Sequence, residues 1–278
     1  MAVDDIAFVL AAIGSRAATG TLIAAAIAVT AWKARALSAG GAVAAVVVGS
    51  ICAAAGWDWG GMLIAFFLTS TLLGRIRSEY RARRIEGIVA KGGARDARQV
   101  LANGGIFAIA ALGSLVSPSP GWLALGGGAL ATAASDTWAT EIGSLAPGSP
   151  RHIFRGHPVP PGTSGAVSVW GSLASLAGAL VIGGAQLIAD WPPAVIVATV
   201  LGGVVGALID SGLGATVQHR RWCDRCNSGT EQAIHGCGSA TRAAGGVAWI
   251  DNDAVNLLSV LAGAATALIL FAVQGLPS

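Results

Sequence analysis

The sequence predicts an all-α polytopic membrane protein, a bundle of about eight transmembrane helices, from three observations. Of its 278 residues, 54% are hydrophobic and only 11% are charged, against about 25% charged residues in ordinary soluble domains. The charged residues are bunched into short polar segments, and the apolar stretches between them approach the roughly 20 residues that a membrane-spanning helix needs. Abundant alanine and glycine let helices approach closely in lipid. We therefore expect one transmembrane domain over residues 1–278.

The distribution of basic residues orients the predicted spans. Asp4 and Asp5 stand where a signal peptide would carry basic residues, so we expect the first span to be retained. Nearly all Lys and Arg residues fall in alternate connections, and the opposite connections contain none. The positive-inside rule then predicts an N-out, C-out protein with its long loops in the cytoplasm, in the inner membrane of a bacterial or archaeal-type cell. The predicted spans are 6–30, 37–56, 60–75, 99–117, 121–141, 165–188, 194–217 and 254–273, and the basic connections are 31–36, 76–98, 142–164 and 218–253.

Acidic residues near the inner ends of spans are the first candidates for chemistry. Asp136 and Asp210 lie toward the C-terminal ends of their spans, where the helix dipole disfavours an anion. Asp253 begins the last span, and a favourable helix dipole is an alternative explanation for it. A carboxylate at the rim of a bilayer is costly unless it is paired, hydrated or bound to a metal. Oxygen ligands at one depth suit magnesium, which keeps water and phosphate ligands, so we expect these residues to meet at the cytoplasmic face: Asp136, Glu141, Asp210 and Asp253, with Asn252 and Asn256.

Two further patterns leave their meaning open. Gly128 and Asp136 have the same spacing as Gly202 and Asp210, which indicates either an internal repeat or a chance match in a glycine-rich chain. Arg16 is the only basic residue predicted inside a span. It either pairs with one of the acids or contacts a substrate.

Two segments are candidates for binding phosphate. The sequence 160–165, Pro-Pro-Gly-Thr-Ser-Gly, runs into a predicted helix, which Thr163 or Ser164 is placed to cap. Free N–H groups at a helix start bind anions, and Gly162 and Arg151 add backbone freedom and charge, although an ordinary Pro/Gly turn is the alternative. The second candidate is the start of the fourth span, with Arg95 and, deeper, Asn103, where positive-inside anchoring and a helix-start acid are the alternative.

A predicted metal site lies in the polar loop 218–253. Cys223 and Cys226 form a Cys-x-x-Cys pair, followed by His235-x-Cys237. Three cysteines and one histidine form a known structural zinc set, and four protein ligands leave no open position for catalysis. The alternative, three unrelated cysteines, fits poorly because Cys52 is the only other cysteine.

The chain also carries a set of motifs in a fixed order. They are Arg95-Asp96-x-x-Gln99-Val100-x-x-Asn103-Gly104, Asp136-Thr137-Trp138-Ala139-Thr140-Glu141-Ile142-Gly143, Pro160-Pro161-Gly162-Thr163-Ser164-Gly165, Asp210-Ser211-x-x-Gly214-Ala215-x-x-Gln218 and Asn252-Asp253-x-Val255-Asn256. Together they resemble the integral-membrane family of domain of unknown function ninety-two, which includes the plant phytyl-phosphate kinase of vitamin E synthesis. The resemblance implies transfer of a γ-phosphoryl group from a nucleoside triphosphate, CTP, to an isoprenoid monophosphate, and leaves the lipid undefined.

On this hypothesis, Asp136, Asp210 and Asp253 hold magnesium, and Glu141, Asn252 and Asn256 support them. The expected substrate-binding residues are Lys33, Arg95, Asn103, Arg151, Gly162, Thr163, Ser164 and Gln218. The expected partners are a prenyl monophosphate, a nucleoside triphosphate and membrane lipids, because a net charge of +3 does not indicate nucleic acid. A transporter or lipid-phosphate flippase and a non-enzymatic zinc-bearing scaffold are the alternatives.

Overall fold

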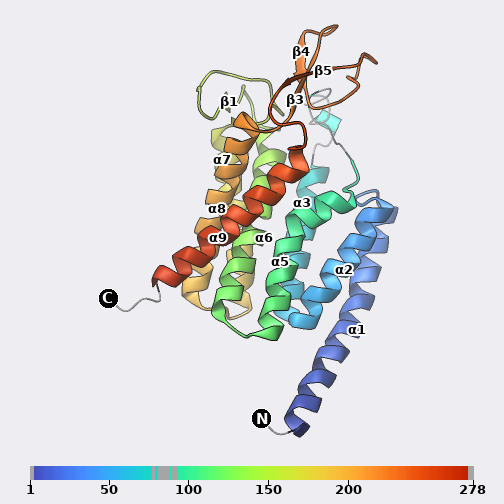
Figure 1. Ribbon diagram of the computed structural model, residues 1–278, viewed down its shortest axis with the longest axis vertical. Coiled ribbons are helices and arrows are strands. Elements are labelled where there is room, and N and C mark those ends of the chain that lie inside the picture. Colours follow the sequence, from blue (N-terminus) through green and yellow to red (C-terminus); the bar gives the residue numbers. More distant parts are fainter. Residues whose placement is uncertain (1–2, 77–78, 81–87, 89–92, 275–278) are drawn as a thin grey trace.

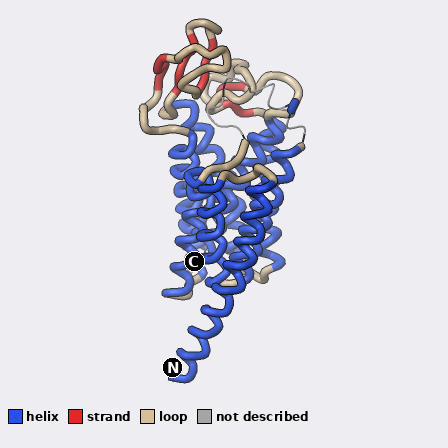
Figure 2. The backbone as a smooth tube through the Cα atoms, turned by 90° about the vertical axis from the view of Figure 1, so that its right-hand side faces the viewer, coloured by secondary structure: helices blue, strands red, loops and turns tan. Residues whose placement is uncertain are grey.

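The computed structural model describes residues 3–76, 79–80, 88 and 93–274. Long helices run side by side, and the strands and the longest loops gather at one end (Figures 1 and 2). The start of α1 and the end of α9 lie toward the opposite end of the bundle (Figure 1). The helices are α1 (Val3–Lys33), α2 (Ala39–Ala55), α3 (Trp57–Arg75), α5 (Ala97–Val116), α6 (Pro120–Gly143), α7 (Val169–Ile188), α8 (Pro193–Thr216) and α9 (Asn252–Gln274).

The prediction of a polytopic helical membrane protein is confirmed. Five of the described helices, α1, α5, α7, α8 and α9, are long and apolar enough to cross a membrane, and α2 is a shorter apolar helix. Helix α6 is less apolar because it lies among other helices: every residue from Gly126 to Ser135 is buried. A helix surrounded by protein needs small side chains more than strongly apolar ones.

Glycines set the packing of α6, α8 and α9. A Cβ added to Gly128 of α6 or to Gly202 of α8 would lie 2.7 Å from the same atom, the carbonyl oxygen of Gly263 in α9. The equally spaced glycines noted in the sequence therefore make equivalent contacts with α9. The Thr132 hydroxyl donates to the Gly128 carbonyl at 2.8 Å. These close approaches fix the three helices that carry the predicted magnesium ligands.

Helices α1, α2, α3 and α5 form the other half of the bundle, and an aromatic cluster joins it to the connection between α7 and α8. Trp59 of α3 packs against Phe107 of α5 and Trp191, with ring centroids 5.0 and 5.1 Å apart. The Trp191 indole donates a hydrogen bond to Asp58 Oδ2 at 2.8 Å. Because an indole N–H needs a partner when buried, Asp58 has a structural role far from the loop-bearing end.

The loop-bearing end contains two small antiparallel sheets. Strand β1 (Arg151–His152) pairs with β2 (Ala166–Val167), and β3 (Arg220–Cys223) lies between β4 (Ser228–Thr230) and β5 (Arg242–Gly245). The three-stranded sheet is tied to the bundle by a hydrogen bond from the His219 amide to the Ile250 carbonyl at 2.7 Å. Most of the basic run from Arg75 to Arg98 lies outside the described residues.

Candidate functional site

Helices α6, α8 and α9 bring two of the predicted magnesium ligands together near the loop-bearing end. The carboxyl groups of Asp136 and Asp210 lie within hydrogen-bonding range of each other, and both residues are half-buried. Ser259 of α9 donates to Asp210 Oδ2 at 2.9 Å. Two carboxylates in contact repel each other unless a proton or a cation lies between them. The pair therefore fits a divalent cation.

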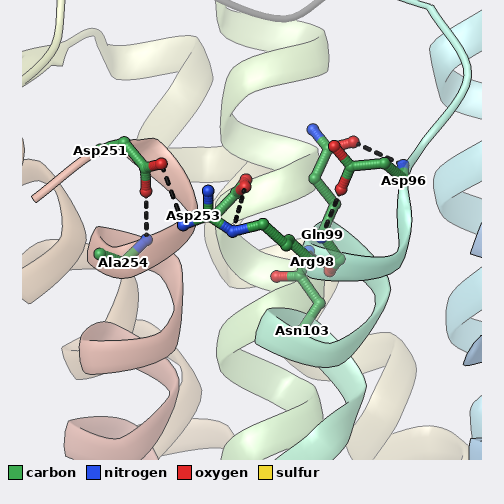
Figure 3. Close-up of polar contacts among 7 residues, drawn as sticks. All are labelled: Asp96, Arg98, Gln99, Asn103, Asp251, Asp253 and Ala254. Atoms are coloured by element: carbon green, nitrogen blue, oxygen red, sulfur yellow. Dashed lines mark hydrogen bonds and ion pairs between the residues drawn. The ribbon is translucent and has the colours of Figure 1, made fainter. Parts of the chain in front are cut away.

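Asp253 lies on the first turn of α9 and is almost fully buried, with 4% of its surface exposed. Arg98, on the first turn of α5, reaches across to α9 (Figure 3): its Nη2 lies 3.1 Å from Asp251 Oδ2 and its Nε lies 3.7 Å from Asp253 Oδ2. Asp251 also accepts a hydrogen bond from the Ala254 amide at 3.0 Å. Asp251 thus caps α9, and Asp253 is left buried in its first turn.

Of the three other residues predicted around the carboxylates, Asn256 is the one whose contacts place it near the pair. The Asn256 carbonyl is within 2.9 Å of the Ser259 hydroxyl that also contacts Asp210, so Asn256 lies close to Asp210, whereas Asn252 is exposed at the start of α9. Glu141 stands near the end of α6, where a Cβ on Gly74 of α3 would lie 3.6 Å from its Oε1. Glu141 thus lies between α6 and the end of α3.

The segment from Arg151 to Ser168 differs from its prediction. Neither Thr163 nor Ser164 caps a helix: β2 intervenes, and Ser168 caps α7 by accepting from the Gly171 amide at 3.0 Å. The loop instead makes a turn at Gly162 and packs on α8 at Gly165, both with positive φ (86° and 76°), and a Cβ on Gly165 would collide with Ala215. The predicted helix cap is therefore wrong, because β2 separates Thr163 and Ser164 from α7, and phosphate binding by this loop stays a prediction.

Glu231 was not predicted, and it joins the loop to the three-stranded sheet. Its Oε1 accepts from the Ser164 hydroxyl at 2.5 Å and from the Gln218 side-chain amide at 2.7 Å, and its charge also acts on Asp210. Gln218 is buried, with 3% exposed. The carboxylate thus ties two predicted substrate-binding residues to each other. Nothing in the spacing around Glu231 distinguishes it from other polar loop residues.

The predicted basic residues fall in three different environments. Lys33 is exposed at the end of α1, and Arg151 is exposed with its Nη1 donating to the Gly156 carbonyl at 2.6 Å. Arg95 is half-buried before α5, and burial lowers the pKa of its guanidinium. Arg16 stands 17 residues before Lys33 on α1, about 25 Å along the axis at 1.5 Å per residue. Arg16 is therefore too far from the carboxylate end to pair with those acids.

A cavity of about 230 Å³ lies between α1, α2, α3 and α5. Its walls are apolar except at the start of α5, where Arg95, Gln99 and Asn103 line it. Asn103 donates to the Gln99 carbonyl at 3.0 Å (Figure 3). Asp96 and Gln99 form a reciprocal capping box, each accepting from the other's backbone N–H at 3.0 Å (Figure 3), so the helix-start acid is a cap. The cap fixes the polar end of the cavity.

The predicted metal ligands of the polar loop come together. The ligand atoms of Cys223, Cys226, His235 and Cys237 all lie within 4.8 Å of one another, and the Cys223 and Cys237 sulfurs are 3.7 Å apart. Hydrogen bonding from the Ser239 side chain, and then from His235, lowers the pKa of Cys237 to about 5. Thiolates are the metal-binding form of cysteine. The cluster could therefore hold a metal ion.

Comparisons with known proteins agree on the class of protein. The profile of a family described as "Integral membrane protein DUF92" matches residues 22–264. Protein PGR of Arabidopsis thaliana is 32% identical over 86% of this chain and 91% of that protein. Uncharacterized membrane proteins of Methanocaldococcus jannaschii and a Synechocystis strain are each 31% identical, over 68% and 78% of this chain and 77% and 76% of those proteins. No solved structure matches the chain.

Proposed function

This chain belongs to the integral membrane protein family DUF92, and on that premise we propose that it is a membrane kinase. It transfers a phosphoryl group from a nucleoside triphosphate, CTP in the first instance, to a prenyl monophosphate and yields the diphosphate. The observation that carries the proposal is the contact between the Asp136 and Asp210 carboxyl groups, at the end of the bundle where the long loops gather. Carboxylates grouped in this way bind a divalent cation that holds phosphates.

The proposed reaction requires no covalent bond between the protein and the phosphoryl group. A monophosphate ester is largely dianionic at neutral pH, since its second pKa is about 6, so its oxygen attacks the γ-phosphorus without giving up a proton. The new P–O bond forms as the bond to the β-phosphate oxygen breaks, and the nucleoside diphosphate leaves with that electron pair. Positioning and neutralisation of charge supply the catalysis. No general base is required.

The residues divide into two sets under this proposal. Asp136, Asp210 and Asp253 would hold magnesium, which neutralises charge on the nucleotide phosphates. Glu141, Asn252 and Asn256 would support these acids, and Ser164 and Gln218 are positioned by Glu231. In an inner membrane with the loop-bearing end in the cytoplasm, a water-soluble nucleotide reaches this end and the lipid arrives from the bilayer.

The test is turnover by purified protein. Incubated with magnesium, CTP or another nucleoside triphosphate, and farnesyl or geranylgeranyl monophosphate, the wild-type protein should form the prenyl diphosphate. Folded protein that forms no product with any nucleotide and prenyl phosphate would contradict the proposal. Nucleotide-independent uptake of a lipid phosphate by proteoliposomes would favour a transporter instead.

We also propose that the cluster of Cys223, Cys226, His235 and Cys237 holds a structural zinc ion. All four positions come from the protein, as in closed structural sites. The ion would stabilise a loop that has little core of its own. Elemental analysis of purified protein should find about one zinc per chain, and no zinc would contradict the assignment.

A further inference from the structure

The cavity between α1, α2, α3 and α5 has the shape of a site for one slender chain. Lining residues of α3 run from Trp57 to Phe67, a length of about 15 Å at 1.5 Å per residue. Its volume of about 230 Å³ is below the roughly 300–1,000 Å³ of ordinary small-molecule sites. Since α1 and α5 are long enough to span a membrane, the cavity lies at the depth of the lipid chains. A single hydrocarbon chain fits it better than the paired chains of a phospholipid.

One end of this cavity carries a cation whose side chain has no acidic partner within the described part of the chain. The backbone of Arg95 is held on both sides, with its amide donating to the Ala36 carbonyl and its carbonyl accepting from the Ser38 amide, both at 3.0 Å. Arg95 lines the cavity, and its side chain makes no hydrogen bond or ion pair with the described residues. A partly buried cation is costly unless an anion compensates it. The cavity is therefore suited to a ligand with an apolar chain and an anionic end.

The first turn of α5 connects this end to the acidic cluster. Arg95 lines the cavity just before α5. Arg98, on the first turn of α5, reaches Asp251 and Asp253 at the start of α9 (Figure 3). An anion held at Arg95 is thus separated from the α9 acids by little more than one helix start. This arrangement places the acceptor on one side of α5 and the proposed nucleotide-binding acids on the other.

We infer that the cavity binds the prenyl chain of the acceptor, with its monophosphate at Arg95, and that Gly61 sets how long a chain is accepted. The inference rests on the proposed function. Gly61 lines the cavity four residues after the start of α3, far from Arg95 along the helix, and a Cβ there would meet nothing within 4 Å. The open space around that Cβ leaves room to add a larger side chain at the far end of the cavity.

The substitution Gly61→Leu tests the length assignment. It should lower kcat/KM for geranylgeranyl monophosphate by about tenfold or more, the scale of steric discrimination in apolar pockets, and change it far less for geranyl monophosphate. Gly184→Leu on α7 is the matched control, since a Cβ there also meets nothing within 4 Å and Gly184 does not line the cavity. Both changes favour the helical conformation. An unchanged chain-length profile in Gly61→Leu would overturn the inference while leaving the kinase proposal intact.

Two further measurements separate the acceptor site from the kinase proposal itself. Arg95→Met should raise the KM for the prenyl phosphate about tenfold or more with little change in the KM for the nucleotide, because a charge-assisted hydrogen bond to the phosphate is lost. A photoreactive farnesyl monophosphate should crosslink to α1, α2, α3 or α5, whether or not the protein turns over. Crosslinks confined to α6–α9, or a resident phospholipid that prenyl phosphate does not displace from the cavity, would refute the site. Absent turnover with correct crosslinking would refute the kinase proposal alone.

Discussion

Glycines of α6, α8 and α9 have different surroundings from several glycines of α3 and α5 in the other half of the bundle. In the half built from α6, α8 and α9 they bring backbones into contact: a Cβ on Gly203 of α8 would lie 2.7 Å from the Ala131 Cβ and 3.0 Å from its carbonyl carbon. In α3 and α5 of the other half, Gly61 and Gly105 have nothing within 4 Å, and a Cβ on Gly104 would meet its nearest neighbour at 3.4 Å. Close packing makes the first half rigid. In the second half Gly20 and Gly49 bring α1 and α2 together, but α3 and α5 leave room.

The comparison explains how one bundle can meet two different demands. Phosphoryl transfer needs acids held in fixed geometry, and α6, α8 and α9 fix Asp136 and Asp210 against each other. A lipid substrate needs an opening at bilayer depth, and the looser packing beside α5 provides one. Helix α5 belongs to both halves, because it lines the cavity through Gln99 and reaches Asp253 through Arg98.

The largest expected effect comes from the rigid half. Asp210→Asn keeps the shape of the side chain and an oxygen for the Ser259 hydroxyl, but removes the charge that would hold magnesium. We expect turnover to fall by at least about 100-fold, the scale of losing one preorganised electrostatic group, with the melting temperature little changed. Asp58→Asn is the matched control, since Asp58 contacts Trp191 at the other end of α3. Comparable activity in Asp210→Asn and the wild type would remove Asp210 from the site.

The packing contrast itself can be tested with alanine. Gly203→Ala forces a methyl group against Ala131, and overpacking of a tight core costs about 1–3 kcal/mol. Gly105→Ala meets nothing within 4 Å and should be neutral or raise stability by up to about 1 kcal/mol through helix propensity. Thermal unfolding in detergent compares the two. Equal melting temperatures would show that the two halves do not differ in rigidity.

A smaller effect is expected from the metal cluster, which lies outside the bundle. Cys237→Ser should abolish zinc in elemental analysis and lower turnover about tenfold, because the loop that carries Glu231 then loses its order. Exposed Asp224→Asn is the matched control, since Asp224 lies in the same loop and pairs only with exposed Arg242 among the described residues, and surface pairs contribute about 0–1 kcal/mol. Full zinc content in Cys237→Ser would exclude Cys237 as a ligand.

Composition was enough to predict the membrane bundle, and spacing was enough to predict the metal cluster, since Cys223, Cys226, His235 and Cys237 are close in sequence. Three other features depend on tertiary structure and could not be predicted from composition or spacing. The segment 160–165 has the sequence pattern of a helix start, but it precedes β2, which pairs with β1. Gly61 and Gly203 both lie in apolar, glycine-rich helices. Only the structure shows that Gly203 packs against a neighbouring helix and that Gly61 faces open space. Glu231 acts on Ser164, 67 residues away.

The smallest expected effect tests whether Glu231 acts through the residues it holds. Glu231→Ala removes the acceptor for Ser164 and for buried Gln218, and each lost hydrogen bond is worth about 0.5–1.5 kcal/mol, so we expect turnover to fall about fivefold to tenfold. Glu231→Gln keeps an oxygen that can accept both bonds and should restore most of the activity. Rescue by glutamine distinguishes a positioning residue from a magnesium ligand, because an uncharged amide would replace a metal-binding carboxylate poorly. If glutamine and alanine are equally damaging, the charge of Glu231 is what matters, and the acidic set around Asp210 must be enlarged to include it.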